Sequence, residues 1–218
     1  MGRSKLIRFQ VNAESLNLLE PGKPSYENLK GNWSKYFNNN NEIVLELGCG
    51  RGEYTTGLAN IFPNKNFIGI DVKGARLWKG SKVALESNYN HVAFLRAQIQ
   101  NLENFFKKKE VSEIWITFPD PRAKDNQEKL RLTNLRFLNI YKNIMIPSGI
   151  VNFKTDNLDL FNFSLQVLKE LPFEIHNFQW TNDLYNSPLL NYHYNIQTTW
   201  EKKFLDQEIK INYLRFNF

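Results

Sequence analysis

The feature that most constrains this chain is an apolar segment that leads into three closely spaced glycines and then into a predicted helix. It covers residues 42–54, with the sequence EIVLELGCGRGEY. Because glycine has no Cβ, the backbone around Gly48, Gly50 and Gly52 can approach a ligand closely, and the start of the next helix offers N–H donors without partners. The segment therefore predicts a cradle for a nucleotide-like cofactor.

A second apolar segment supports this prediction. Residues 66–71 end in Asp71, about twenty residues beyond the last glycine, which is the separation expected when an acid at the end of a second strand binds a ribose diol. The glycine spacing does not fit nicotinamide-binding proteins, because their pattern would require a glycine at Glu53. The spacing therefore argues against a dehydrogenase.

The composition indicates a globular chain with a basic balance. Of the 218 residues, 42% are hydrophobic and 23% are charged, which is enough for one well-filled core. The formal net charge of +6 favours a polyanionic partner, although many soluble proteins are mildly basic.

Cysteine and histidine usage argues against a metal centre. Cys49 is the only cysteine, so an internal disulfide and a cysteine metal cluster are both excluded, and a reducing compartment is expected. His91, His176 and His193 are too far apart in the sequence for a local metal motif.

No apolar run reaches the roughly 18 residues of a membrane span, and no apolar signal core follows Met1. We therefore expect a cytoplasmic protein without metal or membrane partner.

Short apolar runs alternate with helical stretches, a pattern typical of a parallel sheet covered by helices on both faces. Strands are predicted at 43–47, 66–71, 92–96, 111–118 and 149–155, and helices at 52–61, 73–86, 101–107, 134–145 and 158–169. After Pro172, segments 173–180, 198–205 and 209–216 predict further strands at an antiparallel edge, and 182–195 predicts a long surface loop. The expected fold is a single-domain, Rossmann-like α/β fold.

Residues 1–41 are a polar and aromatic lead-in to the main domain, which we place at 42–218. A turn is predicted where proline and glycine cluster at 21–24. After it, four apolar residues recur at helix-like intervals, namely Tyr26, Leu29, Trp33 and Phe37. This spacing predicts a short helix that packs on the main body rather than a separate domain.

Acidic residues follow two of the later predicted strands. Asp120 lies between Pro119 and Pro121, which restrict the backbone and hold it at the carboxyl end of a strand, where open α/β sheets bind ligands. A plain rigid turn is the alternative. Asp156 follows the next strand, and as an alternative it or Asn157 caps the following helix.

The first two motifs resemble those of class I S-adenosylmethionine-dependent methyltransferases. The resemblance implies that the acid matching Glu46 lies beside the methionine end of the cofactor and that Gly48 and Gly50 approach it. It also implies that Asp71 binds the ribose hydroxyls. The chemistry agrees, because carboxylates complement an ammonium and a sulfonium and accept hydrogen bonds from a diol.

The later motifs resemble those of the bacterial tRNA (guanine-N7-)-methyltransferase family. The family's Phe-Pro-Asp-Pro acid falls on Asp120, its tRNA-contacting lysine on Lys124, its Lys-Thr-Asp acid on Asp156, and its Thr-x-x-Glu pair on Thr198 and Glu201. The resemblance implies methyl transfer from S-adenosylmethionine to N7 of a guanine in the variable loop of tRNA. It also implies tRNA as the partner. No obligatory protein partner is apparent from the sequence, and both a monomer and a homodimer stay open.

The expected roles follow from the chemistry of guanine N7, which has a free lone pair. Transfer of an activated methyl group to it needs alignment and nearby negative charge rather than a strong base. We assign that charge, and a contact to the cofactor, to Asp120. Asp156 and Glu201 are expected to accept hydrogen bonds from the guanine, with Thr198 assisting.

The chain departs from the family pattern at four places. Asp71 stands where the family usually has Glu, and Gln98 stands where an Asp or Asn commonly contacts the adenine. The family's Trp-Pro is replaced at residues 122–123, and its dense basic run is thinned at 124–131. RNA binding by this loop is therefore expected to be weaker or shared with the lysines at 107–109.

Two alternative functions remain open from the sequence. A non-catalytic RNA-binding protein that retains the fold would fit the basic balance and Gln98. A methyltransferase with a small-molecule or protein acceptor would keep the glycine motif but would not need the three later motifs together. Binding of S-adenosylmethionine separates the first from an enzyme, and methyl transfer to bulk tRNA separates the second.

Overall fold

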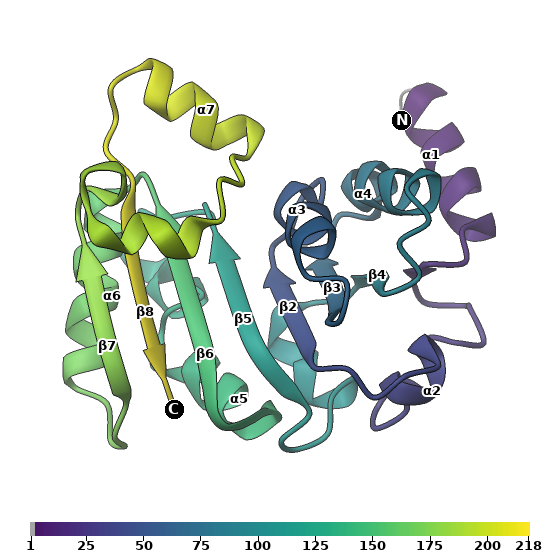
Figure 1. The fold of residues 1–218 in the computed structure, drawn as a ribbon, viewed down its shortest axis with the longest axis horizontal. Helices are drawn as coiled ribbons and strands as arrows, with labels where there is room; N and C mark the ends of the chain where they lie inside the picture. Colours follow the sequence, from purple (N-terminus) through teal and green to yellow (C-terminus); the bar gives the residue numbers. More distant parts are fainter. Residues whose placement is uncertain (1–2) are drawn as a thin grey trace.

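The computed structural model describes the backbone of residues 3–218, together with their side chains except those of residues 3–6, 9 and 125. Across these residues an eight-stranded sheet has the order β1-β4-β3-β2-β5-β6-β8-β7 (Figure 1). β8 is antiparallel to both of its neighbours, and the other neighbouring strands pair in parallel. The predicted Rossmann-like α/β fold with an antiparallel C-terminal edge is therefore confirmed.

The strands and helices agree with the prediction through the centre of the chain. The strands are β1 (Leu18–Leu19), β2 (Ile43–Leu47), β3 (Asn66–Asp71), β4 (Val92–Arg96), β5 (Val111–Thr117), β6 (Met145–Thr155), β7 (His176–Thr181) and β8 (Asn212–Asn217). The α-helices are α1 (Arg3–Glu14), α2 (Trp33–Phe37), α3 (Glu53–Ile61), α4 (Gly74–Glu86), α5 (Leu135–Ile144), α6 (Leu158–Lys169) and α7 (Thr199–Asp206). The 3-10 helices are η1 (Ile99–Asn104), η2 (Asp125–Leu130), η3 (Leu184–Asn186) and η4 (Pro188–His193).

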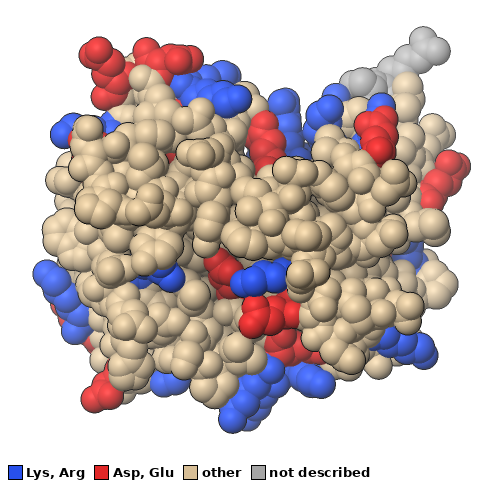
Figure 2. All heavy atoms as spheres, viewed as in Figure 1, with Lys and Arg blue, Asp and Glu red and all other residues tan. Residues whose placement is uncertain are grey.

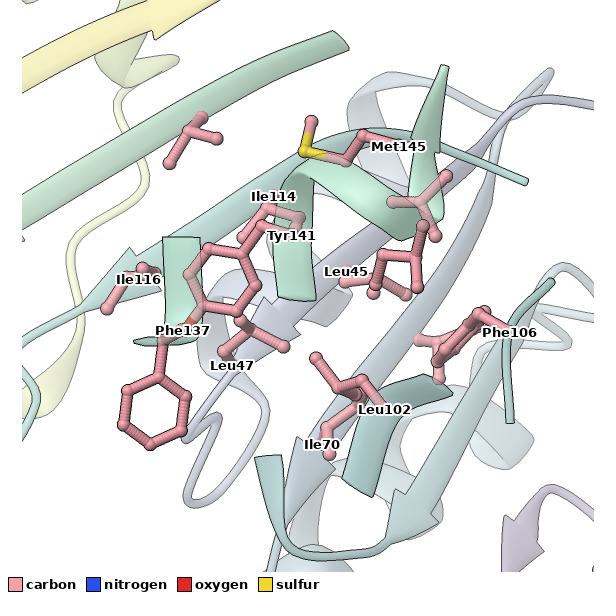
Figure 3. Packing of buried hydrophobic residues seen from close by; sticks show 14 of the residues in the cluster. Leu45, Leu47, Ile70, Leu102, Phe106, Ile114, Ile116, Phe137, Tyr141 and Met145 are labelled. Atoms are coloured by element: carbon pink, nitrogen blue, oxygen red, sulfur yellow. The ribbon is translucent and has the colours of Figure 1, made fainter. Parts of the chain in front are cut away.

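Buried apolar side chains fill both faces of the sheet, because successive residues of a strand point to opposite faces. On one face, Leu45 and Leu47 of β2 and Ile70 of β3 pack with Leu102 of η1 and Tyr141 of α5 (Figure 3). Helix α6 contributes further buried residues to this cluster. The central strands are therefore buried on this side by α5, α6 and η1.

The opposite face has a second core of buried side chains. Val44 of β2, Phe94 of β4 and Trp115 of β5 pack there with Tyr54 and Leu58 of α3. Because both faces are covered, every residue of β2 and β3 is buried, which explains why these strands read as continuous apolar runs. The edge formed by the carboxyl ends of the strands remains as the place for a ligand.

The lead-in contributes a strand that the sequence pattern did not predict. β1 pairs in parallel with β4, with Leu18 opposite Phe94. The Lys23 ammonium donates to the carbonyl oxygens of Asn12, Ser15 and Leu18, each at 2.6 Å, and so ties the end of α1 to β1. Residues 18–19 therefore extend the main sheet.

The expected helix after the turn is shorter than its apolar spacing indicates. It covers only α2, whose Trp33 is fully buried and lies parallel to Phe106, with ring centroids 5.2 Å apart. Tyr26 and Leu29 precede the helix in a non-helical stretch, although both still pack on the core. Residues 26–37 are therefore held on the main body by aromatic packing rather than by one continuous helix.

Three predictions of local structure are wrong. The helix expected at 101–107 is the 3-10 helix η1, which is kinked at Asn101. The strand expected at 198–205 is helix α7, because the Thr198 hydroxyl accepts from the backbone N–H of Glu201 and caps a helix there. The expected surface loop at 182–195 contains η3 and η4.

Candidate active site

A cavity of about 230 Å³ lies at the carboxyl ends of β2 and β5. These two strands are neighbours in the sheet, and the strand order reverses between them, which is where open α/β sheets bind ligands. Figure 1 shows α7 above the end of β5 and facing α3, and Figure 2 shows the upper edge of the molecule hollowed between these parts. The lining residues are Glu46, Gly48, Cys49, Gly50, Arg51, Glu53, Arg76, Thr117, Phe118, Thr198, Thr199, Trp200 and Lys203.

The glycine loop forms one wall of this cavity. Gly48 and Gly50 have φ of +74° and +56°, a left-handed backbone conformation that residues with a side chain rarely adopt. A Cβ added to either glycine would meet no atom within 4 Å. A Cβ on Gly52 would instead overlap the ring of Phe94. Gly48 and Gly50 therefore leave open space in front of the backbone, whereas Gly52 allows the loop to pack on β4.

Glu46 places a buried carboxylate at the floor of the cavity. Its Oε2 accepts from the backbone N–H of Thr55 at 2.7 Å and from the Thr55 hydroxyl, and its Oε1 accepts from the Thr117 hydroxyl at 3.1 Å. Burial raises the pKa of Glu46 to about 7, in spite of these hydrogen bonds. A cationic group bound in the cavity would favour the charged form of the Glu46 carboxylate.

Asp71 fixes the shape of the glycine loop. Its Oδ2 accepts from the backbone N–H of Gly50 at 3.0 Å, and its Oδ1 accepts from the N–H of Lys73 at 2.7 Å. The side chain is buried and does not line the cavity as it stands. Each carboxylate oxygen keeps a second lone pair for a ligand hydroxyl.

Helix α7 is fastened across the mouth of the cavity by α3. The backbone N–H of Thr199 donates to Oε2 of Glu53 at 3.0 Å, and the Thr199 hydroxyl donates to Oε1 of the same side chain. Glu53 lies in the first turn of α3, directly after the glycine loop. The start of α7 is therefore positioned relative to that loop.

A buried charge cluster fastens α7 from below. The ammonium of Lys154 lies 2.7 Å from Oε1 and 2.9 Å from Oε2 of Glu201, and neither side chain is exposed. His193 Nε2 lies 3.0 Å from Oε1 of Glu201, and the Tyr185 hydroxyl donates to the same oxygen at 3.1 Å. Desolvation lowers the pKa of Lys154 to about 8, whereas His193 and Lys154 hold the pKa of Glu201 below its usual value against desolvation.

This cluster changes the expected role of Glu201. The sequence predicted that Glu201 accepts hydrogen bonds from a guanine, but its side chain is not exposed, and its carboxylate already contacts Lys154, His193 and Tyr185 inside the protein. Thr198 does line the cavity, and its hydroxyl caps α7. The structure differs from the expectation because the segment is a helix that turns Glu201 inward.

The other predicted acids follow neighbouring strands outside the cavity. The backbone N–H of Phe118 donates to the carbonyl of Lys154 at 2.8 Å and holds the ends of β5 and β6 together. Asp120 and Asp156 come two residues beyond this contact. Asp120 is exposed and accepts from the backbone N–H of Arg122 at 3.1 Å, whereas Asp156 is half-buried, and desolvation raises its pKa.

The remaining predicted residues are exposed. Gln98 accepts a hydrogen bond from the Gln100 side chain at 2.8 Å, and Lys124 precedes η2. The lysines at 107–109 come just before the amino end of β5 and therefore lie at the opposite edge of the sheet from the cavity. They are not placed to share RNA binding with the loop around Lys124.

Several cavity residues were not predicted from the sequence. Arg51 and Arg76 bring two positive charges to the lining, and Thr117 brings a hydroxyl from the end of β5. Arg51 and Thr117 were within reach of prediction, because they directly adjoin the glycines and the Phe-Pro-Asp-Pro motif. Trp200 lies inside the Thr-x-x-Glu motif, whereas Arg76 lies within α4 and no local pattern marks it.

The described residues contain neither a cluster of metal ligands nor a helix that could span a membrane. No group of three or more His, Cys, Asp or Glu side chains is arranged to hold a metal ion. Among the helices described here, none is both long and apolar enough to cross a membrane.

The sequence has close relatives over its whole length. Residues 40–214 match a family model described as putative methyltransferase. The chain is 53% identical over 218 residues to the tRNA (guanine-N(7)-)-methyltransferase of Cytophaga hutchinsonii, which covers 100% of this chain and 99% of that relative. It belongs to the tRNA (guanine-N(7)-)-methyltransferase family. Another member, from Christiangramia forsetii, is 44% identical and covers 98% of this chain and 97% of its own length.

Solved structures show that the fold of this family member is shared more widely. A structure described as an antibiotic related methyltransferase has a TM-score of 0.63 at 21% identity and covers 86% of this chain and 92% of that one. The 16S rRNA methyltransferase KamB has a TM-score of 0.62 at 12% identity, with the same coverage. At such identities the likeness concerns the fold.

Proposed function

We propose that this protein is a tRNA (guanine-N7-)-methyltransferase, which transfers a methyl group from S-adenosylmethionine to N7 of a guanine in the variable loop of tRNA. The observation that carries the proposal is the glycine-walled cavity between β2 and β5, in a chain that is 53% identical over its full length to a relative of that name. The names of the relatives support tRNA as the methyl acceptor, and the cavity supports S-adenosylmethionine as the methyl donor.

The cavity residues fit S-adenosylmethionine. Gly48 and Gly50 face open space, so the ligand can lie directly against the backbone. The buried carboxylate of Glu46 suits the ammonium at the methionine end, and the guanidinium groups of Arg51 and Arg76 suit its carboxylate. Asp71 would take the ribose hydroxyls, as a neighbour of the glycine loop.

The chain needs no base or nucleophile for this reaction. When bound, S-adenosylmethionine supplies a methyl group that is already activated by its positive sulfur. The protein has to align that group with the lone pair of N7 and to offset the positive charge that develops on the guanine. Asp120, which is exposed at the carboxyl edge of the sheet, would supply negative charge beside the base.

Asp156 and Glu201 would act differently from each other. Asp156 is half-buried, and within the described part of the chain no other side chain binds its carboxylate, so it can accept a hydrogen bond from a guanine N–H. Glu201 would position α7 through Lys154 rather than touch the base. A guanine within folded tRNA would have to turn out of its stack to reach this edge.

The test is methyl transfer to an unmodified tRNA transcript with isotopically labelled S-adenosylmethionine, followed by nucleoside analysis. We expect label in 7-methylguanosine and in no other nucleoside. The matched control is the same transcript with the variable-loop guanine replaced by adenine, which should receive no label. Label on another atom, or no label together with undetectable binding of S-adenosylmethionine by calorimetry, would overturn the proposal.

A further inference from the structure

Trp200 stands out among the exposed apolar residues. Its side chain is 59% exposed, and of the large apolar side chains exposed in the described part of the chain it alone lines the cavity. It lies in the first turn of α7, at the mouth of the cavity. A large aromatic ring at this place is open both to solvent and to whatever enters.

The packing of α7 does not require this indole. Thr199 fastens the helix to Glu53, and Glu201 fastens it to Lys154. Among the described residues, the ring and cation–π contacts of Trp200 are with residues of its own helix. The ring of Phe204 lies 6.4 Å away at an angle of 24°, and the ammonium of Lys203 lies 4.9 Å from the indole centroid.

Phe204 connects Trp200 to the end of β5. Its ring lies 5.7 Å from that of Phe118, which also lines the cavity and precedes the Phe-Pro-Asp-Pro acid. Trp200, Phe204 and Phe118 thus form a continuous aromatic surface from the mouth of the cavity to the strand end that leads to Asp120.

We propose that Trp200 is the platform on which the extruded target purine of the RNA stacks. The inference deepens the proposed function and rests on it. A base that leaves the helical stack loses its aromatic neighbours, and an exposed indole replaces them without reading the sequence. Lys203, also in the lining, adds positive charge that suits the phosphate of the same nucleotide.

The test compares Trp200→Ala, Trp200→Phe and Trp180→Ala. Trp180 is the matched control, because it is 52% exposed on β7 and does not line the cavity. Each variant is assayed for kcat and KM with unmodified tRNA, for binding of S-adenosylmethionine by calorimetry, and for tRNA affinity by fluorescence anisotropy. Because Ala favours helices, the Trp200→Ala variant should keep α7.

We expect Trp200→Ala to lower kcat/KM for tRNA by roughly tenfold or more, the loss typical of one base–aromatic stack. Its affinity for S-adenosylmethionine should stay within about twofold of the wild type, Trp200→Phe should recover most of the activity, and Trp180→Ala should match the wild type. Equal kcat/KM in Trp200→Ala and Trp180→Ala would overturn the inference, as would a loss confined to cofactor binding.

Failure of the proposed function looks different. If the wild-type protein binds tRNA but does not methylate it, the proposed methyl transfer is wrong. The tRNA affinities of the variants then still test whether a base stacks on Trp200. A weaker affinity in Trp200→Ala than in Trp180→Ala then supports the platform, and equal affinities reject it. If the wild type binds no tRNA, both proposals fall.

Discussion

The ammonium of Lys154 lies within 2.9 Å of both carboxylate oxygens of Glu201, and neither side chain is exposed to solvent. Lys154 comes from the end of β6, an interior strand of the sheet, and Glu201 comes from α7, which forms part of the cavity wall. The pair therefore connects the helix at the mouth of the cavity to an interior strand of the sheet. Its loss should affect stability and the cavity together.

Lys154→Met should destabilise the protein by about 3–5 kcal/mol, because it leaves the Glu201 carboxylate buried without its ion-pair partner. The double variant Lys154→Met with Glu201→Leu should recover more than half of this loss, since apolar residues of similar volume can replace a buried pair. Urea unfolding of the wild type, Lys154→Met, Glu201→Leu and the double variant measures the coupling. Additive losses in the double variant would show that the two side chains do not act as a pair.

Gly50→Ala and Gly52→Ala should separate binding from folding. Both residues have positive φ, so either alanine costs about 1–2 kcal/mol of backbone strain. At Gly50 the new methyl group enters open space and should weaken binding of S-adenosylmethionine with little further loss of stability. At Gly52 it overlaps Phe94 and should destabilise the fold more. Thermal melts and calorimetry on both variants test this, and equal stability losses would contradict it.

The central strands could be predicted because burial on both faces leaves continuous apolar runs that are visible in the sequence. Strand β1 could not, since its two residues form a strand only by pairing with β4. The prediction of a strand at 198–205 was wrong, because Trp200 and Phe204 lie four positions apart, which is a helical spacing. The same Thr-x-x-Glu residues also fit the start of a helix, and the cap at Thr198 decides the outcome.

The candidate site was predictable where a single segment carries it. Glu46, Gly48 and Gly50 lie within one short motif, and the structure brings all three to the same cavity. The pairing of Lys154 with Glu201 joins residues 47 positions apart and depends on where α7 packs. No local sequence pattern shows where α7 packs. The Thr-x-x-Glu motif therefore suggested that Glu201 contacts the substrate, whereas in the fold its carboxylate pairs with Lys154.

Binding of S-adenosylmethionine should strengthen as the pH rises through about 7. Burial raises the pKa of Glu46 from 4.5 to about 7. The native state therefore holds the carboxyl proton of Glu46 more tightly than the unfolded chain does. As the pH rises from 4.5 to about 7, ionisation of Glu46 lowers the free energy of unfolding. The ammonium of the ligand prefers the charged carboxylate. Calorimetry from about pH 6 to about pH 8 should show up to roughly tenfold tighter binding. Glu46→Gln should bind weakly at every pH, and an unchanged profile in this variant would contradict the assignment.

Asp120→Asn should lower methyl transfer without unfolding the protein. The Asp120 side chain is 65% exposed, and its oxygen lies 3.6 Å from Nε of Arg122, so losing this contact should change the free energy of unfolding by less than about 1 kcal/mol. Loss of negative charge beside a guanine that becomes cationic should lower kcat by about a hundredfold. Asp159→Asn, at an exposed site in the first turn of α6, is the matched control and should leave kcat unchanged. Near-normal turnover of tRNA by Asp120→Asn, with the control equally active, would reject Asp120 as the residue that offsets the developing charge.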